Sequence, residues 1–70
     1  MSRVQADFSI ALIQLKKGEK AARVEWPEGV HLEVHENENG PYLVEVHGSQ
    51  VLTYVAYSAD ILATDWVQVA

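Results

Sequence analysis

Side chains that could bind an anionic ligand are concentrated at one place in this 70-residue chain. Lys20, Arg23 and Trp26 fall close together, although the chain has only five Lys and Arg residues in all. Arg can form a forked pair of hydrogen bonds to a phosphate, Lys offers a point charge, and a Trp ring can stack on a nucleobase. This spacing indicates a candidate nucleotide site. The structural alternatives are ion pairs for the two cations and a core position for Trp26.

A second stretch, residues 60–66, combines two carboxylates with the other tryptophan. Asp60 is able to accept a hydrogen bond from a ribose hydroxyl, but capping of nearby amides is the favoured interpretation. Asp60 and Asp65 form no carboxylate pair of assignable geometry. We expect Trp66 to be a core residue that packs with Ile61 and Leu62.

A rival site consists of imidazoles and carboxylates that alternate along two expected strands: His31, Glu33, His35, Glu45 and His47. These groups are metal ligands, but alternating polar residues are more typical of a solvated sheet face, so we expect no metal. The chain has no Cys, and its four glycines are dispersed rather than gathered in a phosphate-binding loop. No nucleophile set can be assembled, and we expect neither an enzyme nor a cofactor.

The element that precedes the cationic stretch is an amphipathic helix over residues 8–17. Asp7 is its expected N-cap and Gly18 its left-handed C-terminal residue. One apolar stripe has helical spacing. Ile10 and Ile13 lie off this stripe and form either a wider core face or an oligomer contact.

Alternating residues predict short strands after this helix, at residues 20–26, 30–36, 42–47, 51–57 and 66–69. In the first of them, Lys20 and Arg23 lie on opposite faces. Residues 51–57 are apolar on both faces, which indicates a central strand or one covered by a partner chain. Ser58 is the expected cap of a helical turn over residues 59–63. The predicted architecture is α+β, with one N-terminal helix packed on an antiparallel sheet of four or five strands.

The hairpin between residues 30 and 47 has a register that can be predicted if both apolar rows share a face. A three-residue loop at residues 38–40 satisfies this condition. It pairs Val34 with Val44 and Leu32 with Val46. It also pairs Glu33 with Glu45 and His31 with His47.

The composition limits the class of protein. Residues 1–70 make one domain, and 49% hydrophobic residues in so small a chain favour a homo-oligomer. A net charge of −5 disfavours duplex DNA as a partner. The polar N-terminus, with residues 1–6 as a lead-in, is unlike a signal peptide, and no apolar run has membrane-spanning length. We therefore expect a cytoplasmic protein with no membrane partner.

Both candidate stretches resemble motifs of a family of small phage proteins, the second type of Thoeris anti-defence proteins. The family shares Gly-Lys-x-x-Ala-Arg-x-x-Trp after an N-terminal helix and a final block like Trp-x-Ala-Ser-Gln-x-Asp-Ile-Leu-Ala-x-Asp-Trp. Residues 18–26 and 54–66 are similar to these motifs in the same order. This chain departs from the pattern at residues 27–29 and 57–59, so the identity of a ligand stays open.

The resemblance implies a sponge rather than an enzyme. Family members form dimers that can pair into tetramers, and they sequester cyclic nucleotide immune messengers in the cytoplasm of the infected bacterial host. The messengers are cyclic ADP-ribose isomers made by immune TIR enzymes and, in some relatives, cyclic oligonucleotides. The implied ligand-binding residues here are Trp26, Arg23, Lys20, Tyr54, Ser58 and Asp60. The alternative function is a non-catalytic protein–protein interaction module.

Overall fold

The N-terminal helix α1 spans Phe8–Lys16 in the computed structural model, which describes residues 4–69. Asp7 caps it as predicted, because its carboxylate accepts a hydrogen bond from the Ile10 amide at 3.1 Å. Gly18 follows the helix with a φ of 88°, a conformation that favours glycine. Residues 1–3 of the expected N-terminal lead-in lie outside the described residues. No helix in the described part of the chain is long and apolar enough to cross a membrane.

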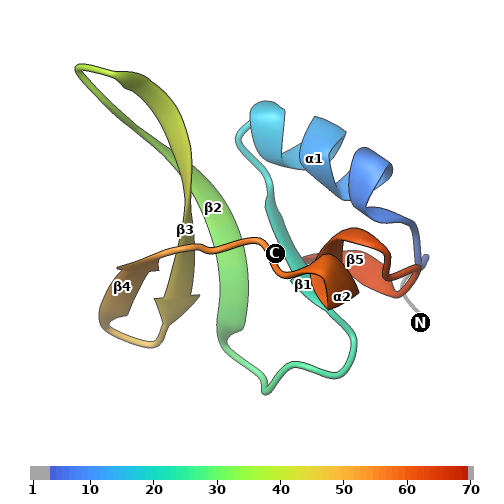
Figure 1. The fold of residues 1–70 in the computed structure, drawn as a ribbon. Helices are drawn as coiled ribbons and strands as arrows, with labels where there is room; N and C mark the ends of the chain where they lie inside the picture. The colour runs from blue at the N-terminus through green and yellow to red at the C-terminus, as the bar shows by residue number, and fades with distance from the viewer. Residues whose placement is uncertain (1–3, 70) are drawn as a thin grey trace.

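Five antiparallel strands form one sheet in the order β4-β3-β2-β1-β5, which confirms the α+β architecture. Figure 1 shows the β2–β3 hairpin extending away from α1, which packs over β1 and β5. The short helix α2 lies in the connection from β4 to β5. The strands and α2 are β1 (Lys20–Arg23), β2 (Val30–Asn37), β3 (Gly40–His47), β4 (Gln50–Thr53), α2 (Ser58–Ile61) and β5 (Trp66–Val69).

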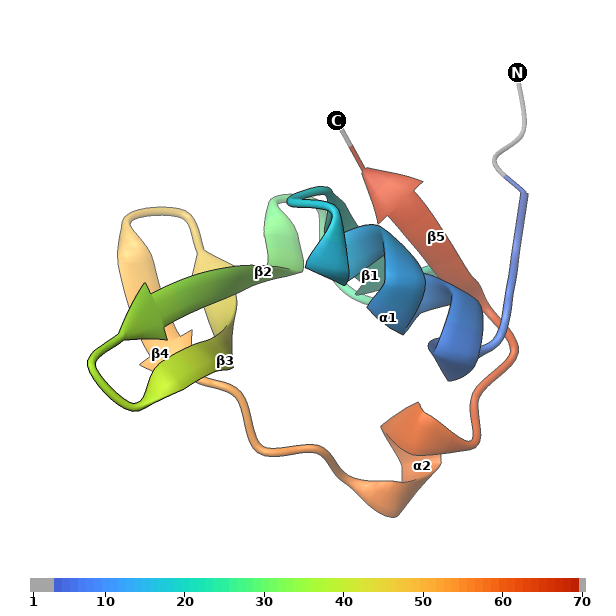
Figure 2. The same cartoon turned by 90° about the horizontal axis from the view of Figure 1, so that it is seen from above.

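The core lies between α1 and the strands β1, β2 and β5. Its fully buried side chains include Leu15 from α1, Leu32 from β2 and Trp66 from β5. Phe8 and Trp26 pack at the edge of this cluster. The core is therefore confined to one half of the sheet, and the far part of the hairpin has no helix against it (Figure 2).

The predicted hairpin register is wrong by one residue. The structure pairs Leu32 with Glu45 and Glu33 with Val44, and the loop contains two residues instead of three. Asn37 stabilises this tight turn, since its side-chain oxygen accepts from the Asn39 amide at 2.8 Å. Burial fixes register only where one face is covered, and no helix covers most of this hairpin, so the turn sets the register. All of the predicted pairs are wrong for this reason: Val34 with Val44, Leu32 with Val46, Glu33 with Glu45, and His31 with His47.

Ile10 and Ile13 are exposed, so the alternative of a wider core face on α1 is wrong, and the alternative of an oligomer contact stays a prediction. Two further predictions differ from the structure: the end of β1 and the place of β4 in the sheet. Strand β1 stops at Arg23 rather than continuing to Trp26, because the Trp26 amide bonds back to the Arg23 carbonyl in a turn. Strand β4 ends at Thr53 and is an exposed edge strand, so the central-strand alternative for residues 51–57 is wrong and the alternative of a strand covered by a partner chain stays a prediction.

Candidate functional site

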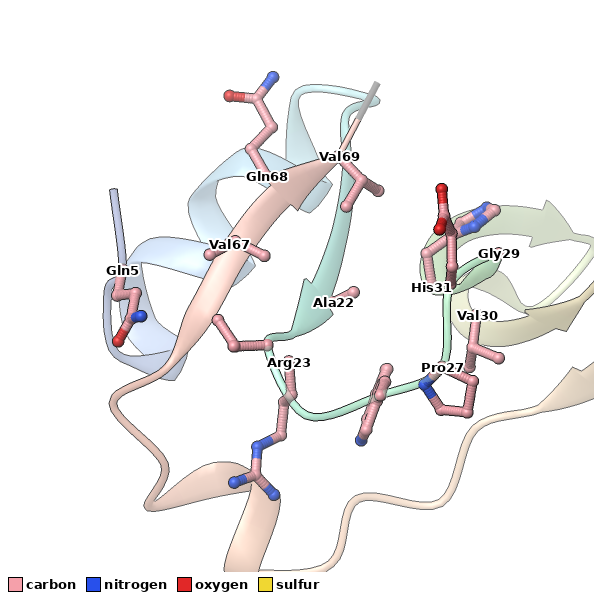
Figure 3. A pocket seen from close by; sticks show the side chains of 13 residues that line it. Gln5, Ala22, Arg23, Pro27, Gly29, Val30, His31, Val67, Gln68 and Val69 are labelled. Carbon is pink, nitrogen blue, oxygen red and sulfur yellow. The ribbon is translucent and has the colours of Figure 1, made fainter. Parts of the chain in front are cut away.

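Trp26 lies at the edge of an open concavity of about 980 Å³. Strands β1 and β5 form one side, and the turn that contains Pro27 and Gly29 forms the other (Figure 3). Pro27 fixes its own φ, so the turn that follows Trp26 is stiff. The Trp26 ring packs edge-on against Trp66, with 5.4 Å between the ring centroids. A half-buried indole held by a core residue at the edge of a hollow is suited to contact a flat ligand.

The concavity lies on the face of the sheet that α1 leaves uncovered. Ala21 contributes to the core beneath α1, so its neighbour Ala22 points to the other face. Ala22 pairs with Val67, and Val69 follows on the same face of β5. These three side chains make an apolar floor, and His31 from β2 lies beside it (Figure 3).

Arg23 is held by three carboxylates. Its Nε donates to Asp65 at 2.9 Å, its Nη1 to Asp60 at 3.0 Å and its Nη2 to Glu25 at 2.9 Å. The hydrogen bond to Asp65, with the other carboxylates, raises the pKa of Arg23 above its ordinary value, so the guanidinium stays charged. Figure 3 shows the side chain directed away from His31 and Val69. The ion-pair alternative for Arg23 is confirmed.

Asp60 is the buried centre of the same network, with 8% of the residue exposed. Its carboxylate accepts from Arg23 and from the Tyr54 hydroxyl at 2.8 Å, while its backbone carbonyl accepts from the Trp66 indole at 2.8 Å. Asp60 therefore does not cap amides with its side chain, and that interpretation is wrong. The predicted Ser58 cap is also wrong, because α2 begins at Ser58 and has Tyr57 as its N-cap residue without a side-chain cap bond.

Lys20 lies away from this network. It is on the opposite face of β1 from Arg23, as predicted, and its Nζ is 3.8 Å from a Glu33 oxygen. Burial and the hydrogen bond to Asp60 raise the pKa of Tyr54 above its ordinary value. The structure thus brings together Arg23, Tyr54 and Asp60, places Trp26 at the concavity, and leaves Lys20 apart.

The predicted cluster of imidazoles and carboxylates is divided between two faces. His31 and His35 both bond to Glu33 on the helix-free face, at 2.8 and 3.0 Å. Glu45 and His47 pair with each other on the other face, because the register differs from the predicted one. No group of three or more metal-ligating side chains in residues 4–69 is arranged to hold an ion.

The Glu33 cluster predicts a pH dependence of stability. Hydrogen bonds from His31 and His35 lower the pKa of Glu33 in the folded protein below its ordinary value of 4.5. As pH falls, the Glu33 carboxylate is protonated in the unfolded chain before it is protonated in the folded protein. The stabilisation by the two His–Glu33 hydrogen bonds is therefore present above pH 4.5 and is lost as pH falls through the lower folded pKa. Glu33→Gln should flatten this part of the profile, measured by urea unfolding between pH 3 and pH 7. If the free energy of unfolding of the variant changed with pH as steeply as that of the wild type, the pH dependence would not arise from Glu33.

Some residues that line the concavity were not predicted. Gln5 and Gln68 belong to the lining, although the Gln68 amide donates to Glu19 at 3.0 Å, and Val67 and Val69 form part of the floor. The alternation in β5 identifies one outward face, but only the pairing of β5 with β1 places that face beside Trp26. Sequence reasoning missed these residues because their types carry no distinctive chemistry.

A helix packed on a five-stranded antiparallel sheet, with an aromatic side chain at an open concavity, defines a small α+β domain. The family model for the Thoeris anti-defense 2-like domain matches residues 6–69. The chain therefore belongs to this family, as its two motifs predicted, and the membership assigns it to phage anti-defence. A search of curated proteins finds no match.

Proposed function

We propose that this protein is a sponge that binds a cyclic nucleotide immune messenger and sequesters it without cleavage. The messenger is a cyclic ADP-ribose isomer or a cyclic oligonucleotide, bound by a homodimer or homotetramer in the cytoplasm of the infected host. The family supports the anti-defence role. The observation that carries the ligand class is Trp26, a half-buried indole at the edge of an open concavity.

In this proposal the base of the messenger stacks on Trp26 above the apolar floor. Ala22, Val67 and Val69 suit the flat faces of a base and a ribose. Most of the lining is apolar or amide, which supports binding rather than bond cleavage. Because the hollow is open, a second protomer would be needed to close it around the ligand.

Arg23 reaches a phosphate in this proposal by exchange of one carboxylate. Its bonds to Asp60 and Asp65 fix the side chain from the buried side, whereas Glu25 is exposed, with 65% of its side chain accessible. A phosphate oxygen can replace Glu25 on Nη2 without disturbing the other two bonds. Asp60 and Tyr54 then act by positioning Arg23. Lys20 and Ser58 are further proposed contacts to the messenger, on the basis of the family motifs.

Trp26→Ala tests the function and the site together. The wild-type protein is incubated with messengers from activated TIR and cyclase enzymes, washed and denatured, and the released molecules are identified by mass spectrometry. We expect an intact messenger from the wild type. Loss of one stacking contact should weaken its binding by about 1–3 kcal/mol, which is roughly tenfold to a hundredfold. Titration calorimetry with the recovered messenger measures this change.

The matched control is Tyr42→Ala, which removes an aromatic side chain from β3 away from the concavity. It should leave messenger affinity unchanged. Recovery of no messenger from the wild type would reject the sponge and favour an interaction module. Recovery of cleaved products would reject sequestration without cleavage. Equal affinities of the Trp26 variant and the wild type would place the ligand elsewhere.

A further inference from the structure

The β5 edge of the sheet is paired at one residue, whereas the β4 edge is unpaired along its length in residues 4–69. At β5, the Ala6 amide donates to the Trp66 carbonyl at 2.8 Å, and the Trp66 amide donates back at 2.9 Å. At the opposite edge, β4 has no neighbouring strand on its outer side in residues 4–69. An uncovered edge is a template for another strand unless charges, proline or a bulge protect it. Strand β4 contains no charged residue and no proline.

The pairing of β4 with β3 determines which backbone groups are free. His47 and Gln50 flank a two-residue turn, and the Tyr54 amide donates to the Leu43 carbonyl at 3.0 Å. Hydrogen-bonded pairs alternate along an antiparallel ladder, so the backbone groups of Gln50, Leu52 and Tyr54 face β3. Those of Val51 and Thr53 therefore face outward. The β4 edge thus offers two amides and two carbonyls, those of Val51 and Thr53.

We propose that the β4 strands of two copies pair antiparallel about a two-fold axis at Leu52, which joins the two sheets. This register places Val51 opposite Thr53 of the second copy, twice, so that all the outward groups of these residues are paired. A register centred on Val51 or on Thr53 would pair one of them with a residue outside β4. The axis brings the two Leu52 side chains together as a pair without backbone hydrogen bonds.

Charge and exposure favour a second copy as the occupant. The chain carries a net charge of −5, and an uncharged contact surface places no like charges directly opposite each other when two copies meet. Residues 48–59 contain no Asp, Glu, Lys, Arg or His, and no other uncharged run of the chain is as long. Within this segment Val51 and Leu52 are more than half exposed, at 52% and 53%. Pairing would bury the Leu52 side chains against each other.

This contact lies at the opposite edge of the sheet from the concavity, so it adds to the homo-oligomer of the proposed function without closing the ligand site. Its test needs no nucleotide. The protein has no cysteine, so single cysteines report the register directly. Directly opposed residues of such a pair have Cα atoms about 4.5 Å apart, within the range of a disulfide. Two Val51 residues would be diagonal neighbours at about 7–8 Å, beyond that range.

The experiment compares Leu52→Cys, Val51→Cys and Glu38→Cys, the last at the tip of the β2–β3 hairpin. Under mild oxidation we expect a covalent dimer as the main species for Leu52→Cys and little for the other two. Thr53→Pro, which removes an outward amide at an edge position that tolerates proline, should abolish the dimer in light scattering. Its circular dichroism should stay close to that of the wild type.

A monomeric wild type at micromolar concentration would overturn the proposal, as would equal cross-linking of Leu52→Cys and Glu38→Cys. Cross-linking of Val51→Cys in preference to Leu52→Cys would overturn the register. If Thr53→Pro does not fold, the cysteine variants still decide the question. Failure of these tests leaves the messenger assay unaffected, and failure of that assay leaves the cross-link unaffected, so the two proposals are separable.

Discussion

Trp66→Ala is expected to lower the free energy of unfolding by about 3–5 kcal/mol, the usual cost of removing a large buried aromatic side chain. Trp66 is 1% exposed and packs against the Phe8 and Trp26 rings, with ring centroids 5.3 and 5.4 Å apart. Its indole also donates to the Asp60 carbonyl. It thereby joins α1, the β1–β2 turn and α2. A domain of this size has little stability to spare, so the variant should be largely unfolded at 37 °C.

Urea unfolding followed by circular dichroism measures this loss. Trp66→Phe is the control, because it keeps an aromatic ring in the core and loses the indole donor, so its loss should be smaller. Trp26→Ala should also cost less stability, since Trp26 is only half-buried. A Trp66→Ala variant as stable as the wild type would mean that the core is organised around other residues.

Arg23→Met is expected to destabilise the fold by about 3 kcal/mol, because it leaves Asp60 and Asp65 without their cation. Both partners of the Arg23–Asp60 pair are mostly buried, with 14% and 12% of their side chains exposed. Methionine approximates the length of the arginine stem, so the loss reports the charge and its hydrogen bonds rather than a cavity. Arg23→Lys should be intermediate, since an ammonium cannot reproduce the fork.

Lys20→Met is the matched control, with the same replacement on the same strand but on its other face. Lys20 makes one 3.8 Å contact with Glu33 and 42% of its side chain is exposed. Its removal should change stability by no more than about 0.5 kcal/mol. Urea unfolding of the two methionine variants gives the comparison. Equal losses would show that the carboxylates do not depend on Arg23.

Local patterns were sufficient for the existence and type of the elements, though not for all of their ends, and for the family. Asp7 and Gly18 mark the ends of α1, since a cap and a left-handed glycine act within a few residues of the helix. The alternation in β5 gave its bounds as observed, and the spacing of Lys20 and Arg23 placed them on opposite faces. The two motifs predicted the family that matches the chain. These features depend on neighbours in the sequence, which the sequence itself displays.

Strand order and register depended on contacts that no local pattern encodes. The apolar residues from 51 onward suggested a central strand, but β4 is at the sheet edge because β3 and β2 stand between it and the core. The hairpin turn, and not an apolar face, set the register, which pairs Glu33 with Val44 and Glu45 with Leu32. This change of one residue moved Glu45 and His47 to the opposite face from Glu33.

At the candidate site, too, the sequence determined some features and the folded structure decided the others. Residue type alone identified Arg23, Trp26 and Asp60 as polar or aromatic groups of interest. Their roles were decided by residues far away in the sequence: Asp65 and Asp60 hold Arg23, and Trp66 supports Trp26. The sequence determined which chemical groups were present, whereas the tertiary structure decided which of them face each other. The reason is that hydrogen bonds and packing act over a few ångströms, and only folding brings these distant segments within that range.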